Sequence, residues 1–137
     1  MAINIRKTDY FYASIHEEPD EAYKLLTEFA EIGVNLLAFN AIPMGPDRTQ
    51  FTLFPEDSNL LSRAAEKIGF SIDGPHPALL VQGDDELGAL TGIHNKLHQA
   101  NVNVYASSGV TDGKGSFGYV VYIRPEEYDR AVSALDI

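Results

Sequence analysis

The segments AEIGVNLLAFNAI (Ala30–Ile42) and HQANVNVYASSGV (His98–Val110) decide the fold, because they are two versions of one pattern. Asn35 in the first segment aligns with Asn103 in the second, at an offset of 68 residues, and a valine precedes each asparagine. Self-similarity at a fixed spacing is the mark of a repeated structural unit. The sequence therefore predicts two tandem copies of one unit.

Two further matches support the duplication. Gly33 aligns with Asn101, and glycine and asparagine are the residues that best tolerate the left-handed conformation that ends a helix. Further along, TLFPED from Thr52 matches VVYIRPEE from Val120, with Pro55 set against Pro125 at an offset of 70. This alignment implies an insertion of two residues, and it predicts that in both copies a proline followed by acids opens a helix directly after an apolar strand.

Apolar periodicity predicts the order βαββαβ for the first copy. Its expected elements are a strand at 10–16, a helix at 19–32, strands at 34–42 and 49–54, a helix at 56–68 and a short strand at 69–73. The expected elements of the second copy are a strand at 78–83, a helix at 86–100, strands at 102–108 and 117–123, and a helix at 126–135.

We therefore expect an α+β fold made of two units, residues 1–74 and residues 75–137, each with an antiparallel sheet and its helices on one face. The second copy lacks a closing strand. The alternating residues INIR (Ile3–Arg6) have no role in the first copy, so residues 2–6 are a candidate for that strand, and an unpaired tail is the alternative.

Composition limits the possible functions. Of 137 residues, 45% are hydrophobic, which suits one compact domain or two small ones. The net charge of −10 repels phosphate, so we expect no nucleic-acid or membrane partner. No run approaches the roughly 20 apolar residues of a membrane helix, and the N-terminus does not resemble a secretory signal, so a cytoplasmic location is expected. The absence of cysteine excludes disulfides and thiolate chemistry.

The quoted pattern extends to VQGDDELGALTGIHNKLHQANVNV (Val81–Val104) and SIHEEPDEAYKLLTEFAEIGVNLLAF (Ser14–Phe39). In this arrangement of strand, acids, first helical turn and helix, closed by Gly-Val-Asn or Asn-Val-Asn, the chain resembles the ACT domain over nearly its whole length, as two tandem copies. The resemblance implies ferredoxin-like βαββαβ units with their sheets joined edge to edge. It also implies a stand-alone regulatory module, not an enzyme, that binds an amino acid where two copies meet.

In ACT domains the loop between the first strand and the first helix binds the ligand. Carried onto this sequence, the resemblance places the loop glycine at Gly88, an acid at Asp85 and the asparagine after the helix at Asn103. In the first copy the matching positions are Asp20, Glu17 and Asn35. The first copy keeps the proline of the family pattern, Pro19, without the glycine, and the second keeps the glycine with Leu87 in place of the proline.

The chemistry of this loop suits a small zwitterion. Amide groups at a helix start attract a carboxylate, and a glycine there leaves room for it to approach. Asp85 can accept hydrogen bonds from an ammonium group, and Asn103 can both donate and accept. The predicted ligand is a free amino acid or a similar zwitterion, and the predicted binding residues are Asp84, Asp85, Glu86, Leu87, Gly88, Asn103, His16, Glu17 and Asn35.

Each of these residues also has a structural interpretation. Asp84 or Asp85 can cap a helix, Gly88 can allow close packing, and the asparagines can stabilise turns. His94 and His98 stand four residues apart, a spacing that can bind zinc, but no third ligand is evident and a packing role is favoured. We expect no metal and no cofactor.

No acid, base and nucleophile share a recognised spacing, so no catalytic residue is predicted. Two alternatives stay open: a small metal-dependent enzyme on paired βαββ modules, using His16, His76 or Glu17, and a dimerisation module without a ligand. Strands with apolar residues on both faces predict a homodimer. These residues are Leu36, Leu37, Val104, Tyr105, Val121 and Tyr122.

Overall fold

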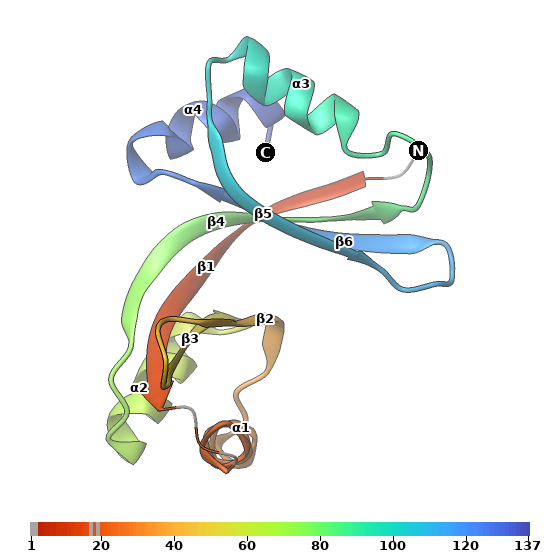
Figure 1. Ribbon diagram of the computed structural model, residues 1–137. Coiled ribbons are helices and arrows are strands. Elements are labelled where there is room, and N and C mark those ends of the chain that lie inside the picture. The colour runs from red at the N-terminus through yellow and green to blue at the C-terminus, as the bar shows by residue number, and fades with distance from the viewer. Residues whose placement is uncertain (1–2, 17, 19) are drawn as a thin grey trace. The chain divides into compact units, whose positions relative to one another are not determined.

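The computed structural model describes residues 3–16, 18 and 20–137 (Figure 1). It is an α+β structure, as predicted. Its elements are β1 (Ile3–His16), α1 (Glu21–Ile32), β2 (Leu36–Pro43), β3 (Arg48–Pro55), α2 (Ser58–Ile68), β4 (Asp73–Asp84), α3 (Thr91–Gln99), β5 (Val104–Thr111), β6 (Ser116–Ile123) and α4 (Pro125–Leu135).

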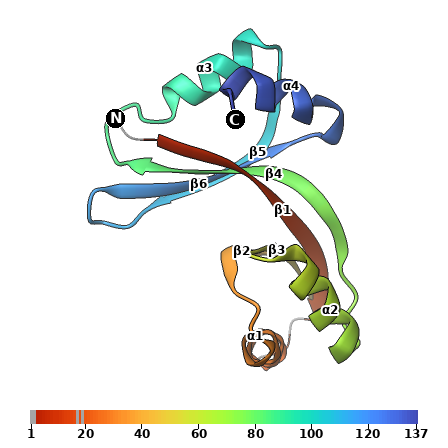
Figure 2. The same ribbon diagram turned by 180° about the vertical axis from the view of Figure 1, so that it is seen from behind.

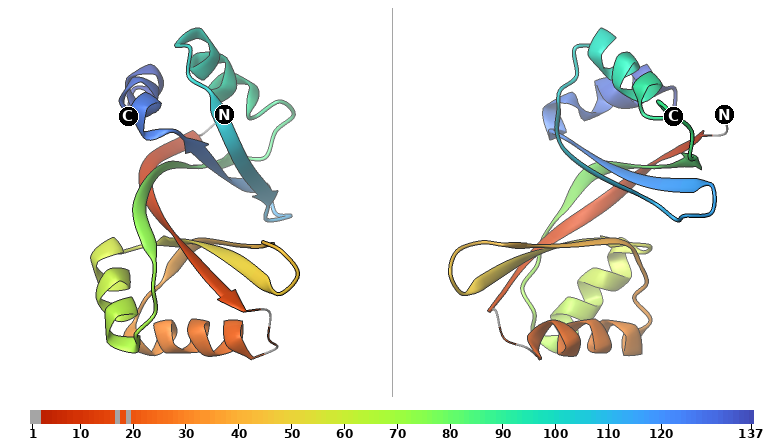
Figure 3. Two further views of the ribbon diagram at one scale, coloured as in Figure 1. Left: turned by 60° about the vertical axis from the view of Figure 1, so that its left-hand side comes forward. Right: turned by 45° about the vertical axis from the view of Figure 1, so that its right-hand side comes forward.

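The chain forms two compact units, Asp9–His76 and a C-terminal unit that combines residues 3–8 with Pro77–Ile137. In the N-terminal unit β3 pairs antiparallel with both β1 and β2. In the C-terminal unit β6 pairs antiparallel with both β4 and β5. Each unit carries its two helices on one face of its own sheet (Figures 2 and 3). The strands β2 and β5 are edge strands.

The core of the N-terminal unit lies between its sheet and α1 and α2. From Phe11 to His16 of β1 alternate residues are buried, as a strand with one face on a core requires. Leu25 and Phe29, one helical turn apart, bury the inner face of α1. The buried cluster contains Phe11, Ala13, Ile15, Leu25, Phe29, Val34, Phe51, Leu53, Leu61, Ala64 and Ala65.

The core of the C-terminal unit repeats this arrangement with α3 and α4. Its buried cluster contains Leu79, Val81, Ile93, Leu97, Val102, Tyr119, Val121, Ile123, Ala131 and Leu135. Ile5 packs against the cluster, so the first strand segment contributes to this core although it lies far away in the sequence. We propose that residues 3–8 act as the closing strand that the second copy of the pattern lacks.

The elements of the two copies correspond at two different offsets in residue number. The strands β2 and β5, and β3 and β6, keep the offset of 68, and both hairpins carry an irregularity at the same place, between Leu36 and Ala38 and between Val104 and Ala106. The burial patterns of β3 and β6 are identical. The helices α2 and α4 correspond at an offset of 67, so the predicted two-residue insertion is wrong.

The error arises because the two prolines have different roles. Pro55 is the last residue of β3, and α2 begins three residues later, at Ser58. Pro125 is itself in the first turn of α4, where its missing N–H costs no hydrogen bond. Matching one proline to the other therefore shifted the alignment of the helices.

The short strand predicted at 69–73 is also wrong. Gly69 has φ 74° and ends α2, with its N–H directed to the carbonyl groups of Ala65 and Glu66. Phe70 and Ile72 then pack against the core from a connecting segment, and β4 begins only at Asp73. Their apolar side chains produced a strand-like pattern in a segment that makes no strand.

Among the described residues, no helix combines the length and the apolar character that a bilayer crossing demands.

Removal of the α2 cap should destabilise the protein measurably. Asp57 accepts hydrogen bonds at its Oδ1 from the N–H groups of Asn59 (3.1 Å) and Leu60 (3.2 Å). Asp57→Ala should lower the free energy of unfolding by about 1 kcal/mol in urea titrations. Asp47→Ala, an equal charge change at an exposed bend, should cost under about 0.5 kcal/mol. Equal losses in the two variants would contradict the capping role.

Candidate functional site

The loop between β4 and α3 departs from the prediction. The sequence predicted a helix from residue 86, but α3 begins at Thr91. Residues 87–90 form turns instead, in which the N–H of Ala89 donates to the carbonyl of Glu86 and the N–H of Thr91 donates to the carbonyl of Gly88, both at 3.0 Å. The acids at the start of the loop therefore do not cap the helix.

Gly88 explains why the helix begins late. Its φ of 75° lies in the left-handed region, which side chains other than glycine rarely adopt. A Cβ added there would meet Thr91 Oγ1 at 3.5 Å, an ordinary contact, so free space is not what selects glycine. Gly88 is required by the turn, and it lies outside the helix rather than in its first turn.

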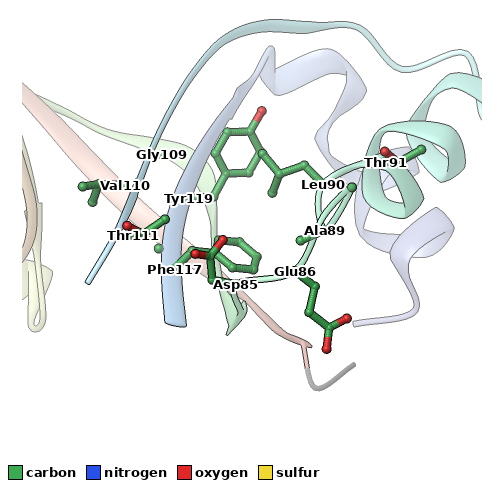
Figure 4. A pocket seen from close by; sticks show the side chains of 12 residues that line it. Asp85, Glu86, Ala89, Leu90, Thr91, Gly109, Val110, Thr111, Phe117 and Tyr119 are labelled. Carbon is green, nitrogen blue, oxygen red and sulfur yellow. The ribbon is translucent and has the colours of Figure 1, made fainter. Parts of the chain in front are cut away.

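A pocket of about 530 Å³ lies between this loop and the β5–β6 hairpin, within the C-terminal unit (Figure 4). Its volume is in the range of small-molecule sites. The loop and the start of α3 contribute Asp85, Glu86, Gly88, Ala89, Leu90 and Thr91, and the hairpin contributes Gly109, Val110, Thr111, Phe117, Gly118 and Tyr119.

Tyr119 forms a fixed wall of the pocket. Its side chain is 6% exposed, and its hydroxyl lies 2.7 Å from Nε2 of His94 on α3. The ring rests on Gly109, its partner across the β5–β6 ladder, where a Cβ would stand 2.9 Å from Tyr119 Cδ1. Gly109 therefore provides the space for the ring, and His94 holds its polar end.

The tip of the hairpin is fixed by Asp112. Its Oδ1 accepts hydrogen bonds from the backbone N–H groups of Lys114 (2.6 Å) and Ser116 (3.1 Å), and these bonds lower the pKa of the Asp112 carboxyl. The N–H of Asp85 donates to the carbonyl of Gly115 at 2.9 Å. The loop and the hairpin that enclose the pocket are thus joined directly.

The structure brings part of the predicted site together. Asp85, Glu86 and Gly88 line the pocket, whereas Asp84, Leu87 and Asn103 are not among its lining residues. Leu87 is fully exposed. Asp84 ends β4 opposite Ser116, and the N–H of Asn103 donates to Glu127 Oε1 at 3.4 Å.

The remaining predicted residues belong to the first copy. Asn35 donates from Nδ2 to Glu56 Oε2 at 2.8 Å. His16 ends β1, and its N–H donates to Glu21 Oε1 at 3.2 Å. Glu17 and Pro19 lie outside the described residues.

Several lining residues were not predicted. Phe117 and Tyr119 alternate along β6 and therefore share one face, and Gly109 and Val110 come from the neighbouring strand. The alternation in FGYVVYI indicates that Phe117 and Tyr119 lie on one face of the strand. The packing of Tyr119 on Gly109 depends on the register of the β5–β6 hairpin, which can be predicted only when the position of its turn is known.

The first copy has different residues at the same places. Ala41 corresponds to Gly109, Leu26 to His94 and Phe51 to Tyr119. The Phe51 ring packs edge-on against Phe39, with ring centroids 4.9 Å apart. The pair of Tyr119 and His94, and the glycine on which the Tyr119 ring packs, are therefore features of the second copy.

The histidines do not gather into a metal site. His94 and His98 lie on the exposed side of α3, and His76 lies 3.4 Å from Asp73 and beside the rings of Tyr10 and Tyr12. In the part of the chain that the structure describes, no three His, Cys, Asp or Glu residues are arranged to hold a metal ion.

Substitutions at two neighbouring glycines should have opposite effects on stability. Gly88→Ala should cost about 1–2 kcal/mol, because alanine is strained in the left-handed turn. Gly92→Ala should stabilise the protein by up to about 1 kcal/mol, because Gly92 lies in α3 with open space around it. Chemical denaturation measures both changes, and a harmless Gly88→Ala would contradict the assigned turn.

The protein is similar to several solved structures. A crystal structure from Bacteroides thetaiotaomicron matches with a TM-score of 0.80 at 14% identity, over 96% of this chain and 88% of that one. The ligand-free regulatory subunit of aspartate kinase from Thermus thermophilus matches with a TM-score of 0.66 at 14% identity, over 98% and 94%. At such low identity these matches establish the fold.

Sequence comparison adds a weaker similarity. No family model matches the chain. The probable L-serine dehydratase beta chain of Bacillus subtilis (strain 168) is 30% identical over 100 residues, which covers 62% of this chain and 46% of that protein. The match thus spans less than half of the relative's length. Taken with the element order and the pairing, the comparisons show that the chain has the ACT-type fold of aspartate kinase regulatory domains, in two tandem copies.

Proposed function

We propose that the protein is a regulatory sensor, not an enzyme, and that it binds a free amino acid in the pocket beside Asp85. The fold supports the regulatory role, because the Thermus thermophilus protein that shares it is a regulatory subunit of an amino-acid kinase. The name of the Bacillus subtilis relative also refers to an enzyme of amino-acid metabolism.

One observation carries the proposal: the loop that the family resemblance implies for ligand binding forms one wall of a pocket whose volume would suit a small molecule. Within the lining, the charged side chains are the carboxylates Asp85 and Glu86. They suit a ligand that carries a positive group and disfavour one with net negative charge. A zwitterion meets this condition.

In the proposed complex the two ends of the amino acid have different partners. The ammonium group donates to the Asp85 carboxylate in charge-assisted hydrogen bonds. The carboxylate faces the start of α3, where Thr91 lines the pocket and the first-turn N–H groups carry partial positive charge. The left-handed turn at Gly88 lies between Asp85, which would bind the ammonium group, and the start of α3, which would bind the carboxylate.

Ligand binding would act on the hairpin. The loop and the hairpin already share the hydrogen bond from Asp85 N–H to the Gly115 carbonyl, and both contact the pocket. A ligand between them adds contacts to both, so it restricts movement of the loop against the edge strand β5. Such a restriction is a means by which occupancy can reach a partner protein.

The first test is a thermal-shift screen of the purified protein against the twenty amino acids. A ligand at 100 times its dissociation constant should add about 2.7 kcal/mol of stability. Asp85→Asn should then weaken binding by about tenfold or more in calorimetry, because it removes a charge-assisted hydrogen bond.

Asp47→Asn is the matched control, since it makes the same change at a bend of the N-terminal unit. Its affinity should equal that of the unmodified protein. If no amino acid stabilises the protein, the sensor proposal fails and the ligand-free dimerisation module takes its place. If Asp85→Asn binds normally, the assigned ammonium contact is wrong.

The homodimer stays a prediction. Among the described residues, exposed apolar side chains of edge strands are Phe39 and Ile42 on β2 and Tyr105 and Val110 on β5, and edge strands can pair with a second chain. Sedimentation at micromolar concentration should therefore give twice the mass of one chain. A monomer under these conditions would contradict the prediction.

A further inference from the structure

We infer that the pocket beside Asp85 selects an amino acid with a large apolar side chain, aromatic or branched. The inference rests on the proposed function and names the ligand class for the same site. It follows from the walls of the pocket, which the family resemblance does not specify.

The walls away from the carboxylates are apolar. Figure 4 shows the side chains of Leu90, Ala89, Phe117 and Tyr119 around one space. These residues come from the loop and from β6, and Thr111 on β5 lies on the same face as Phe117, its partner across the hairpin. A side chain that enters this space loses water on several sides, which favours hydrocarbon over polar groups.

Tyr119 presents its ring and not its hydroxyl. The oxygen is engaged by His94 Nε2 at 2.7 Å, and the ring is supported by Gly109. A polar ligand side chain that sought the Tyr119 hydroxyl would have to displace His94. An apolar side chain can contact the ring as it stands.

The charged groups of the pocket lining disfavour acidic and basic amino acids as ligands. Glutamate or aspartate would bring a second carboxylate to a lining whose charged groups are already Asp85 and Glu86. The Glu86 side chain extends away from the Tyr119 ring in Figure 4, so it is not placed to pair with a lysine ligand inside the apolar space. The lysine ammonium would lose hydration there without an anionic partner.

The size of the pocket favours a large ligand. At about 530 Å³ it is larger than glycine, alanine or serine requires, and these ligands would leave the Phe117 and Leu90 walls in contact with water. Each additional buried methylene contributes to affinity. Binding should therefore strengthen from alanine to leucine or phenylalanine.

The other copy supplies a matched comparison. On β5, Thr111 pairs with Phe117 and lies on the pocket face, and in the other copy Ile42 lies exposed on the edge strand β2. Thr111 and Ile42 are both exposed on edge strands, so a charged residue at either place leaves the core intact. A substitution that affects affinity at one position and not at the other locates the ligand.

The experiment is calorimetry of the full chain with L-phenylalanine, L-leucine, L-serine, L-glutamate and L-lysine. We expect phenylalanine or leucine to bind at least about tenfold more tightly than the other three. Thr111→Asp should weaken that binding by about tenfold or more, and Ile42→Asp should leave it unchanged. Phe117→Ala, which removes one apolar wall, should also weaken the binding, and circular dichroism confirms that each variant is folded.

The outcomes separate this inference from the proposed function. If serine, glutamate or lysine binds as well as the apolar amino acids, the ligand class is wrong while the sensor proposal stands. If none of the amino acids binds, both fail. Unchanged affinity in both the Thr111→Asp and the Phe117→Ala variant would overturn the assignment of the apolar wall.

Discussion

The alternation of side chains along β6 is the constraint on which both the core and the pocket depend. Tyr119, Val121 and Ile123 point to the same face, where α3 and α4 cover the sheet. Because α3 begins only at Thr91, the helices cover this face of the sheet only as far as Tyr119. Phe117, the next residue of β6 on the same face, lines the pocket. In the N-terminal unit α1 begins at Glu21, the counterpart of Ala89, two residues earlier in the shared pattern. The later start of α3 thus leaves space beside the end of β6, where the pocket lies.

Much of the architecture could be predicted from the sequence, because the repeat is visible in short stretches such as the ends of the helices. Gly33 and Asn101 both adopt positive φ, and Val34 and Val102 follow them with equivalent hydrogen bonds to Phe29 and Leu97. The errors have two causes. Pro55 and Gly88 were interpreted by residue type, whereas their roles are set by the backbone conformation around them. Phe70 and Ile72 were interpreted as a strand from their apolar pattern, whereas they pack on the core from a connecting segment.

The candidate site likewise contains residues that the sequence could predict and residues that it could not. Asp85, Glu86 and Gly88 are adjacent in the chain, so a resemblance in one loop could place them together. Tyr119, His94 and Gly109 meet only through the register of the β5–β6 hairpin and the packing of α3 on it. Non-local contacts of this kind have no signature in a short segment. The apolar wall was therefore found only in the structure.

The assignment of residues 3–8 to the C-terminal unit has a consequence for how the protein is made. A ribosome releases this segment well before most of its neighbours in that unit, Pro77–Ile137. Asp9–His76 can collapse meanwhile, since its strands and helices are contiguous in the chain. Residues 3–8 therefore cannot complete their packing until residues 77–137 have been synthesised and have left the ribosome.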